Sequence, residues 1–353
     1  MLIEGLNDLG NRVELKTTNL GSYAHPKQIL NNNEILEYAN NVADIIILGS
    51  NHYVDHKKFW KIKSKKIKRV YVDGWDTSQI YINPLKFRKF DYVFKVNLYE
   101  QDNSIINLFR IILKKNYTLW SIFRSHYLIP YPYFHSMQNL TRFRDILKNT
   151  FFILKQNRMF PFPFSIEKRC QGIFNNKPQF MLSCMLSDDR VMERKKIIEL
   201  LKIKQLPDAF IGKISEDKDS ILEMEGMNGF DPDLPHDLAG YAFHNKNYYH
   251  QIQQSRACIS VPGGGFDTFR FWEVLGQGSL LISKRIAIRM PNPPVEGTHY
   301  MAFDDIEELK ALIEWLYNNP DNADQIRYDG WKYALKYHTS RARAEYFMEI
   351  LKQ

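Results

Sequence analysis

The feature that most constrains this chain is one continuous stretch, residues 257–283, whose pattern is strand, glycine loop, helix, strand. Ala257–Val261 is a short apolar run, typical of a buried parallel strand, and it leads into Pro262-Gly-Gly-Gly265. A helix is predicted from about Asp267 to Leu275, and the apolar run Ser279–Ser283 predicts the next strand. Ligands of open parallel sheets bind at the carboxyl ends of strands, beside helix N-termini. This order therefore predicts a ligand site at the loop.

The loop has the chemistry of an anion site. Its glycines let backbone N–H groups approach a charged ligand closely, and the helix N-terminus adds its positive end. Asp267 or Thr268 can cap the helix. Arg270, one turn further on, can hold a phosphate through two hydrogen bonds.

Glu273 makes the hypothesis more specific. It lies three residues after Arg270, so the two side chains share one face of the helix. A carboxylate one turn deeper than a phosphate-binding arginine suits a pair of ribose hydroxyls. The alternative is an Arg–Glu pair on a solvated helix face. The glycine loop and the apolar strands on either side favour the ligand site.

The rest of the chain alternates strand-like and helix-like segments. In the first half, Asp44–Ser50, Arg69–Asp73 and Asp91–Val96 are short apolar runs that end in turn residues. Alternation of this kind implies βαβ units and open parallel sheets, an α/β fold. Leu2–Leu9, followed by Gly10, is typical of the first helix of such a domain without its preceding strand. That leaves open a misassigned start or a sheet that is one strand short.

The run Phe160-Pro-Phe-Pro-Phe164 interrupts regular structure and is predicted to be an interdomain linker. A chain of 353 residues is long enough for two domains. We therefore predict an N-terminal domain over 1–164 and a second domain over 165–336. Residues 337–353 are predicted to be a helix that packs back on the first domain.

Composition narrows the class of protein without choosing a ligand. The net charge of +8 suits a nucleotide, a nucleic acid or an anionic lipid, and it equally suits a solvated basic surface. The three cysteines match no zinc spacing, so we predict no metal site and a reducing, cytoplasmic setting. The N-terminus lacks a signal-peptide pattern, and the apolar runs are too short to span a bilayer. The expected protein is soluble, or at most peripheral at the inner face of the membrane.

At this point the sequence resembles a known group. The Pro-Gly loop followed by Asp-Thr-Phe-Arg-Phe-Trp-Glu resembles the donor region of GT-B glycosyltransferases, closest to the group 1 type with spore-maturation-like C-terminal domains and to exostosin-like enzymes. Asn247–Ser255 and Tyr337–Ala344 are similar to flanking segments of that family, and Phe160–Phe164 is similar to its linker. The resemblance covers about 160–353 and is only architectural before that. It implies two Rossmann-like domains with parallel sheets facing a central cleft.

The resemblance also implies roles for individual residues. Glu273 matches the family's donor-ribose glutamate, and the loop before it matches the diphosphate-binding loop. Many retaining members carry a second acid eight positions earlier, where this chain has Gly265, and this departure favours inversion. Basic residues after the strand Gln179–Leu186 resemble a second anion contact, although a solvated helix start is an equal alternative. The expected donor-binding residues are Gly263, Gly264, Gly265, Asp267, Thr268, Arg270, Glu273, Arg190 and Arg194, with Lys195 beside them.

An inverting transfer needs a base that takes the proton of the acceptor hydroxyl. The N-terminal domain offers candidates at strand ends, and each of them also suits a turn or a cap. Asp73 and His52 are favoured because each follows an apolar strand; Asp76 and His25 are the others. His299 is a further candidate for the donor pocket.

The predicted function is transfer of a sugar, of the hexosyltransferase type, from a nucleoside-diphosphate sugar to a glycan or lipid-linked acceptor in cell-surface polysaccharide synthesis. No metal and no cofactor beyond the donor are expected. The basic run Lys57–Arg69 and the aromatic, basic block Leu108–Phe134 suit contact with an anionic membrane, and the basic run also suits a solvated helix. The alternatives are a nucleotide-sugar epimerase or hydrolase on the same fold, a non-catalytic nucleotide- or carbohydrate-binding module, and a nucleic-acid-binding protein, the last of which we consider unlikely.

Overall fold

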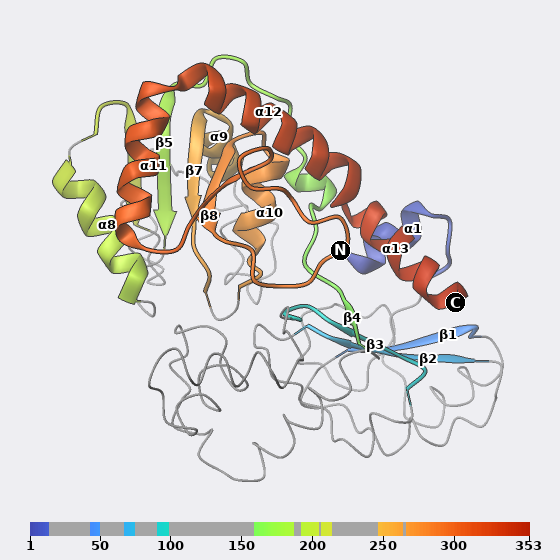
Figure 1. The fold of residues 1–353 in the computed structure, drawn as a ribbon. Helices are drawn as coiled ribbons and strands as arrows, with labels where there is room; N and C mark the ends of the chain where they lie inside the picture. The colour runs from blue at the N-terminus through green and yellow to red at the C-terminus, as the bar shows by residue number, and fades with distance from the viewer. Residues whose placement is uncertain are drawn as a thin grey trace, which may run out of the picture. The chain divides into compact units, whose positions relative to one another are not determined.

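The structure is a computed structural model, and it describes residues 1–13, 43–49, 67–74, 90–98, 159–186, 192–204, 206–213, 246–263 and 266–353. The chain divides into two compact units (Figure 1). The C-terminal unit holds Met1–Asn11, Phe164–Ile286 and Asn292–Tyr346, and the N-terminal unit holds Arg12–Pro163, Ala287–Pro291 and Phe347–Gln353. Each unit is described by itself below.

The N-terminal unit contains a parallel sheet of β1 (Ile45–Gly49), β2 (Lys68–Asp73), β3 (Tyr92–Lys95) and β4 (Met159–Pro161), in that order. The first three strands confirm the sequence prediction to within one residue or two at each end. β4 corrects it, because Phe160 and Pro161 belong to a strand instead of a linker. Pro161 is the last residue of β4, where its missing N–H removes little from the ladder.

Aromatic rings fill the core of this unit. Phe94, fully buried in β3, lies between Phe160, Phe162 and Phe347, with ring centroids 5.5, 5.5 and 4.8 Å away. Phe347 comes from the far end of the chain, in the last helix. Phe162 is buried in this cluster and Phe160 is half-buried, and aromatic contacts of this kind add about 0.5–1.5 kcal/mol each beyond burial.

The C-terminal unit has a five-stranded parallel sheet in the order β6-β5-β7-β8-β9. Its strands are β5 (Phe180–Leu186), β6 (Ala209–Lys213), β7 (Ser255–Ser260), β8 (Leu280–Lys284) and β9 (Met301–Phe303). The helices that connect them are α8 (Met192–Lys204), α9 (Lys246–Gln253) and α10 (Phe269–Gly276). This is the alternation that the sequence predicts, so the α/β class with two parallel sheets is confirmed. β7 begins at Ser255, two residues before the predicted apolar run Ala257–Val261.

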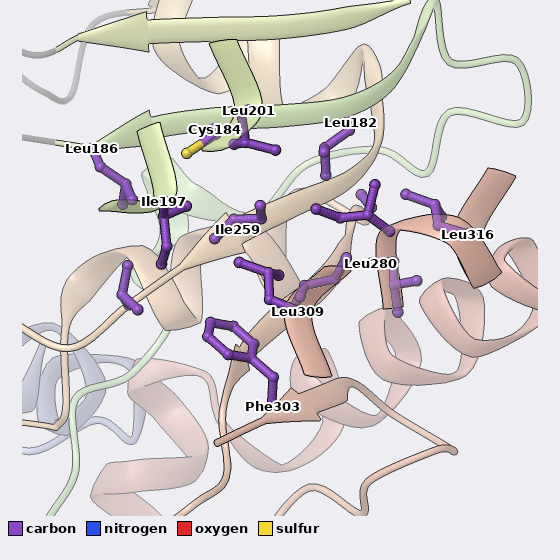
Figure 2. Packing of buried hydrophobic residues seen from close by; sticks show 14 of the residues in the cluster. Leu182, Cys184, Leu186, Ile197, Leu201, Ile259, Leu280, Phe303, Leu309 and Leu316 are labelled. Carbon is purple, nitrogen blue, oxygen red and sulfur yellow. The ribbon is translucent and has the colours of Figure 1, made fainter. Parts of the chain in front are cut away.

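One face of this sheet carries the apolar core (Figure 2). Leu182, Leu186, Ile259 and Leu280 point from the strands toward Ile197 and Leu201 of α8 and toward Leu309 and Leu316 of α11 (Ile306–Asn318), and all of them are buried. The alternate strand positions, Ser183, Ser260 and Ser283 among them, are also buried. Since side chains alternate along a strand, these small polar residues face the opposite side. α10 and α12 (Pro320–Tyr337) contact β7 and β8, and α9 contacts β7.

The chain ends with α13 (Ser340–Lys352), which belongs to the C-terminal unit up to Tyr346 and to the N-terminal unit beyond it. The N-terminal helix α1 (Leu2–Asp8) lies against α13, where a side chain on Gly5 would collide with the carbonyl of Ser340. Gly10 ends α1 with a φ of 78°, and its N–H and that of Asn11 bond back to Asn7 and Leu6.

The division of the chain falls between Pro163 and Phe164, next to the predicted boundary, but α1 belongs to the C-terminal unit and not to the domain over 1–164. The contacts of α1 explain the difference: Met1 and Asp8 pair with Glu167 and Lys168 of the short 3₁₀ turn region around η4 (Lys168–Cys170). None of the helices in the described ranges is long and apolar enough to cross a membrane.

Candidate functional site

The candidate site lies in the C-terminal unit where β7 ends and α10 begins. Val261 and Pro262 are buried after the last residue of β7, and Gly263 is half-buried. Gly264 and Gly265 lie outside the described residues. Thr268 is the N-cap of α10, and its hydroxyl accepts from the N–H of Phe271 at 3.4 Å. The carboxyl end of a central strand therefore meets the N-terminus of a helix, the position expected of an anion site.

Arg194 of α8 brings a positive charge to this loop. Its Nη2 donates to the carbonyl of Val261 at 3.2 Å, and a Cβ placed on Gly263 would lie 3.0 Å from the same nitrogen. The absence of a side chain at Gly263 thus leaves room for the guanidinium against the loop. Of the other basic residues predicted here, Lys195 is exposed, and Arg190 lies outside the described residues.

Arg270 and Glu273 are joined by one tyrosine hydroxyl. Arg270 Nε donates to Tyr248 Oη at 3.1 Å, and that hydroxyl donates to Glu273 Oε2 at 3.0 Å. Tyr248 comes from α9 and is 2% exposed, Glu273 is 5% exposed, and Arg270 is half-buried. The two residues share a face of α10 as the sequence predicts, but they are connected through a third residue.

A second tyrosine approaches the same carboxylate. Tyr249 Oη lies 3.4 Å from Glu273 Oε1 and 3.2 Å from Cys170 Sγ. Burial, followed by the nearby Glu273 charge, raises the pKa of both tyrosines above its ordinary value. Burial likewise raises the pKa of the Cys170 thiol to about 11. These groups therefore stay neutral near pH 7, and the tyrosines act as hydrogen-bond donors to the glutamate.

Arg270 stays protonated in this setting. Burial alone would lower its pKa, but Tyr248 and Glu273 raise it above the ordinary value for arginine. The carboxylate of Glu273 accepts from both tyrosines. A carboxylate with this geometry can accept from the hydroxyls of a sugar ring while the tyrosines hold it in place.

Asp267 has a different role from the loop residues around it. Its Oδ2 accepts from the N–H of Phe164 at 2.5 Å, and its Oδ1 accepts from Trp272 Nε1 at 2.7 Å. The side chain is 3% exposed. Asp267 therefore ties the start of α10 to the segment at Phe164, and the capping role that it could have had belongs to Thr268.

Beside Asp267 lie two buried residues from the end of the chain, Arg343 and His338. Arg343 Nη2 donates to the carbonyl of Phe164 and lies 3.2 Å from His338 Nδ1, and both residues are 1% exposed or less. Burial, together with the charge of Arg343, lowers the pKa of His338 well below its ordinary value. Burial also lowers the pKa of Arg343 to about 10, although Asp267 opposes this. His338 is thus neutral, and Arg343 carries the charge that faces Asp267.

The candidate bases have separate surroundings. Asp73, at the end of β2, is fully buried and accepts from Lys95 Nζ at 3.1 Å, within the N-terminal unit. His52, Asp76 and His25 lie outside the described residues. His299 stacks on Tyr333 with ring centroids 4.0 Å apart, and its Nδ1 accepts from the N–H of Val295 at 2.9 Å. Both Asp73 and His299 are thus engaged with their own unit.

Sequence reasoning missed the two tyrosines and the Arg343–His338 pair. The sequence shows two adjacent tyrosines near the start of a helix, but only the structure shows that both of them are buried. The closing His-Thr and Arg-Ala pattern contained His338 and Arg343, but nothing in it indicates that they pack against Trp272, whose ring lies 4.6 Å from that of His338. Within the described ranges, no three metal-ligating side chains gather closely enough to hold an ion.

Comparison with protein families gives one match. The family model described as "Glycosyl transferase-like" covers residues 223–349, a range that includes α9, β7, α10 and the residues Tyr248, Arg270 and Glu273. This part of the chain is therefore similar to a glycosyl transferase-like domain. Comparison with curated proteins gives no match.

Among solved structures, a glycosyltransferase from Rickettsia africae is similar, with a TM-score of 0.53 and 14% identity, over 99% of this chain and 92% of that one. The GtfA/B complex (TM-score 0.47, 13% identity) and TarM (0.49, 10%) each match 90% of this chain. The chain spans 59% and 57% of the length of these two. At such identities the likeness shows the fold alone. With the two parallel sheets, it shows the GT-B architecture that the sequence predicts.

Proposed function

We propose that this chain is a glycosyltransferase that uses a nucleoside-diphosphate sugar as its donor. The observation that carries the proposal is the arrangement at the end of β7. The start of α10, the Arg194 guanidinium and the linked Arg270–Tyr248–Glu273 triplet lie together. The triplet lies within residues 223–349, which match a glycosyl transferase-like family, and Arg194 contacts Val261 of the same segment. This set combines groups for a diphosphate with a carboxylate for a ribose.

In this proposal the protein stabilises the departing diphosphate. Negative charge grows on the diphosphate as its bond to the sugar breaks, and the helix N-terminus, Arg194 and Arg270 are cationic groups fixed in advance. Glu273 binds the ribose hydroxyls by charge-assisted hydrogen bonds, each worth about 1.5–3 kcal/mol. These groups supply the electrostatics without a metal, so we propose a metal-independent transfer with no cofactor beyond the donor. Full activity after treatment with EDTA would support this, and loss of activity that added Mg²⁺ restores would contradict it.

We further propose that the transfer inverts the anomeric centre. The acceptor oxygen forms its bond to the anomeric carbon as the bond to the diphosphate breaks on the opposite face, and a base takes the acceptor's proton. The support is Gly265, which stands where many retaining relatives of the resembled group carry an acid. Asp73 and His52 remain the candidates for the base. The anomeric configuration of the product, measured by NMR, decides between inversion and retention.

The acceptor is proposed to be a glycan or a lipid-linked sugar of a cell-surface polysaccharide pathway, with the enzyme in the cytoplasm or at the inner face of the membrane. The support is the basic run Lys57–Arg69, most of which lies outside the described residues. Lys68, at its end, donates to the carbonyl of Leu351, so this lysine serves its own unit. Sedimentation with anionic vesicles that disappears at high salt would support membrane contact, and absence of sedimentation would contradict it.

The deciding experiment is a thermal-shift screen of the full chain with UDP, GDP, ADP, CDP, TDP and their sugars. A ligand that binds only the folded protein stabilises it and raises its melting temperature. At a ligand concentration of one hundred times Kd, the gain in stability is about 2.7 kcal/mol. No shift with any nucleotide would rule out the proposal. Turnover of a nucleotide sugar without an acceptor would favour an epimerase or hydrolase, and binding without any turnover would favour a non-catalytic module.

Glu273→Ala tests the site itself. The variant is expected to lose most of its affinity for the nucleoside diphosphate identified in the screen, because the ribose loses its carboxylate partner. Glu314→Ala, on the exposed side of α11, is the control and should bind like the wild type. Unchanged affinity in the Glu273 variant would show that the ribose role is assigned to the wrong residue.

A further inference from the structure

The hydroxyl of Tyr248 is the point at which the two halves of the candidate site meet. It lies between a cation, Arg270, and an anion, Glu273, at 3.1 and 3.0 Å. Without it, Arg270 and Glu273, three residues apart on α10, could form a direct ion pair. The inserted hydroxyl contacts both side chains and comes from a different helix, α9.

The direction of this chain of hydrogen bonds follows from the chemistry of its members. A guanidinium can only donate, and an ionised carboxylate can only accept. Arg270 Nε–H therefore points at the tyrosine oxygen, and the tyrosine proton points at Glu273 Oε2. Each bond in such a chain polarises the next and strengthens it. The positions of the arginine and of the glutamate are thus set by the same atom.

Tyr248 is well placed to hold that atom still. Its side chain is 2% exposed, and α9 packs on β7, the strand that leads into the glycine loop. An aromatic side chain has only two rotatable bonds, so little freedom is left once its ring is buried. Arg270 is half-buried, whereas Tyr248 and Glu273 are buried.

We infer that Tyr248 is a positioning residue that orients Glu273 toward the ribose and Arg270 toward the diphosphate, so that the preference for a ribose over a 2′-deoxyribose depends on its hydroxyl. This rests on the proposed function, since it assigns the alignment of the same site. Tyr249 contributes less, because its hydroxyl is 3.4 Å from Glu273 and is also in contact with Cys170.

The test measures binding of UDP, GDP, ADP and CDP, each beside its 2′-deoxy form, to the full chain by isothermal titration calorimetry. For the nucleotide that binds, the wild type is expected to prefer the ribose form by about tenfold or more, as a hydrogen bond to a charged group would give. In Tyr248→Phe, which keeps the ring, this preference should fall to about threefold or less. Binding of inorganic pyrophosphate should weaken by about threefold, through Arg270.

Tyr317→Phe is the matched control, because it also removes one tyrosine hydroxyl, which donates to the carbonyl of Pro207 elsewhere in the same unit. It should keep the ribose preference. A merely structural role for Tyr248 would weaken the ribose and 2′-deoxy forms by the same factor, and this result would overturn the inference. An unchanged ribose preference in Tyr248→Phe would overturn it as well.

The two proposals fail in distinguishable ways. If the wild type binds no nucleoside diphosphate, the proposed function fails and the inference with it. If the wild type binds and discriminates while Tyr248→Phe does the same, only the positioning role fails. A third variant set adds Tyr248→Phe to Glu273→Gln. If Tyr248 acts on the ribose through Glu273, this addition leaves the ribose preference of the single Glu273→Gln variant unchanged, and a further loss would contradict the route through the glutamate.

Discussion

Each of the two units places an acidic and a basic side chain around the carboxyl ends of its parallel strands, but the two sets are built differently. In the N-terminal unit, Asp73 and Lys95 end neighbouring strands and form a direct ion pair, with both side chains 1% exposed or less. In the C-terminal unit, a neutral hydroxyl separates Arg270 from Glu273. A direct, buried pair satisfies charge within the fold. A pair held apart by a hydroxyl keeps each charge oriented by a hydrogen bond to a third residue.

The difference matters for where a ligand can bind. Removing charges from water is costly, and a buried ion pair recovers that cost mainly through its own geometry. The Asp73–Lys95 pair therefore has the character of a structural element of the sheet. The Arg270–Tyr248–Glu273 set, at a helix N-terminus with Arg194 nearby, is the one to which we assign the proposed donor.

The largest expected effect concerns Asp73. Asp73→Asn leaves the Lys95 ammonium buried beside a neutral amide, and breaking a buried pair on one side costs about 3–5 kcal/mol of unfolding free energy. Glu273→Gln should cost about 1 kcal/mol, since the amide oxygen still accepts from Tyr248. Urea unfolding measures both changes.

A double variant, Asp73→Leu with Lys95→Met, controls for the unpaired charge and should recover much of the stability that Asp73→Asn loses. Equal losses in Asp73→Asn and Glu273→Gln would remove the distinction between the two sites. Transfer activity that falls in Asp73→Asn while the protein stays folded would instead support Asp73 as the base.

The next largest effect compares two arginines of the C-terminal unit, one at the candidate site and one away from it. Arg194→Met removes the guanidinium that lies against Gly263, so the Kd of a bound nucleoside diphosphate should rise by about tenfold to a hundredfold, as expected for a charged hydrogen bond. Arg256→Met removes an arginine that pairs with Asp324 in the same unit, and it should leave that Kd unchanged. Calorimetric titration measures both. A similar rise in the two variants would indicate a general effect of charge instead of a specific contact.

The sequence predicts the framework of both units because local patterns carry it. Strands β1, β2, β3 and β8 begin and end within one residue of the apolar runs that predict them. The glycine loop and the shared face of Arg270 and Glu273 also follow from spacing alone.

What the sequence could not predict depends on elements that meet only in the folded chain. Tyr248 reaches Glu273 from a separate helix, and no local rule places its hydroxyl between two charges. Asp267 looked like a loop residue for the ligand, but Phe164 and Trp272 take both of its oxygens. The strand β4 could not be recognised because the Phe-Pro pattern has turn residues. Its partner strand β3 lies 66 residues earlier in the chain, as Phe94 and Phe160 show. In each case the role of the residue or segment is determined by a partner that it meets only in the folded chain.

A smaller effect concerns the pH dependence of stability, which we expect to come from a histidine of the C-terminal unit. His338 is buried with its pKa well below its ordinary value, so at pH below about 6.5 the unfolded chain binds a proton that the folded chain does not. The free energy of unfolding should therefore fall as the pH falls below that value, by up to about 1.4 kcal/mol per pH unit. Arg343 on α13, Trp272 on α10 and Tyr333 on α12 surround the ring.

His338→Gln should flatten this dependence, whereas the substitution of exposed His250 by Gln should leave it as it is. Chemical unfolding at pH 7.0, 6.0 and 5.5 measures the slopes. An equal slope in wild type and His338→Gln would place the titrating group elsewhere, the N-terminal unit included.

The smallest expected effect tests whether the N-terminus of α10 is kept available for an anion. Thr268 accepts from Phe271 N–H at 3.4 Å, a long bond, whereas Asp305, the cap of α11, accepts two N–H groups at 2.9 Å each. Thr268→Ala should therefore cost only about 0.5 kcal/mol, and Asp305→Ala about 1 kcal/mol or more. A bound diphosphate would take over the N–H groups that Thr268 leaves weakly satisfied, so the cost of Thr268→Ala should shrink further when the nucleotide is present. Thermal unfolding with and without the nucleotide measures this difference; a cost that stays the same would mean that the ligand does not contact the first turn of α10.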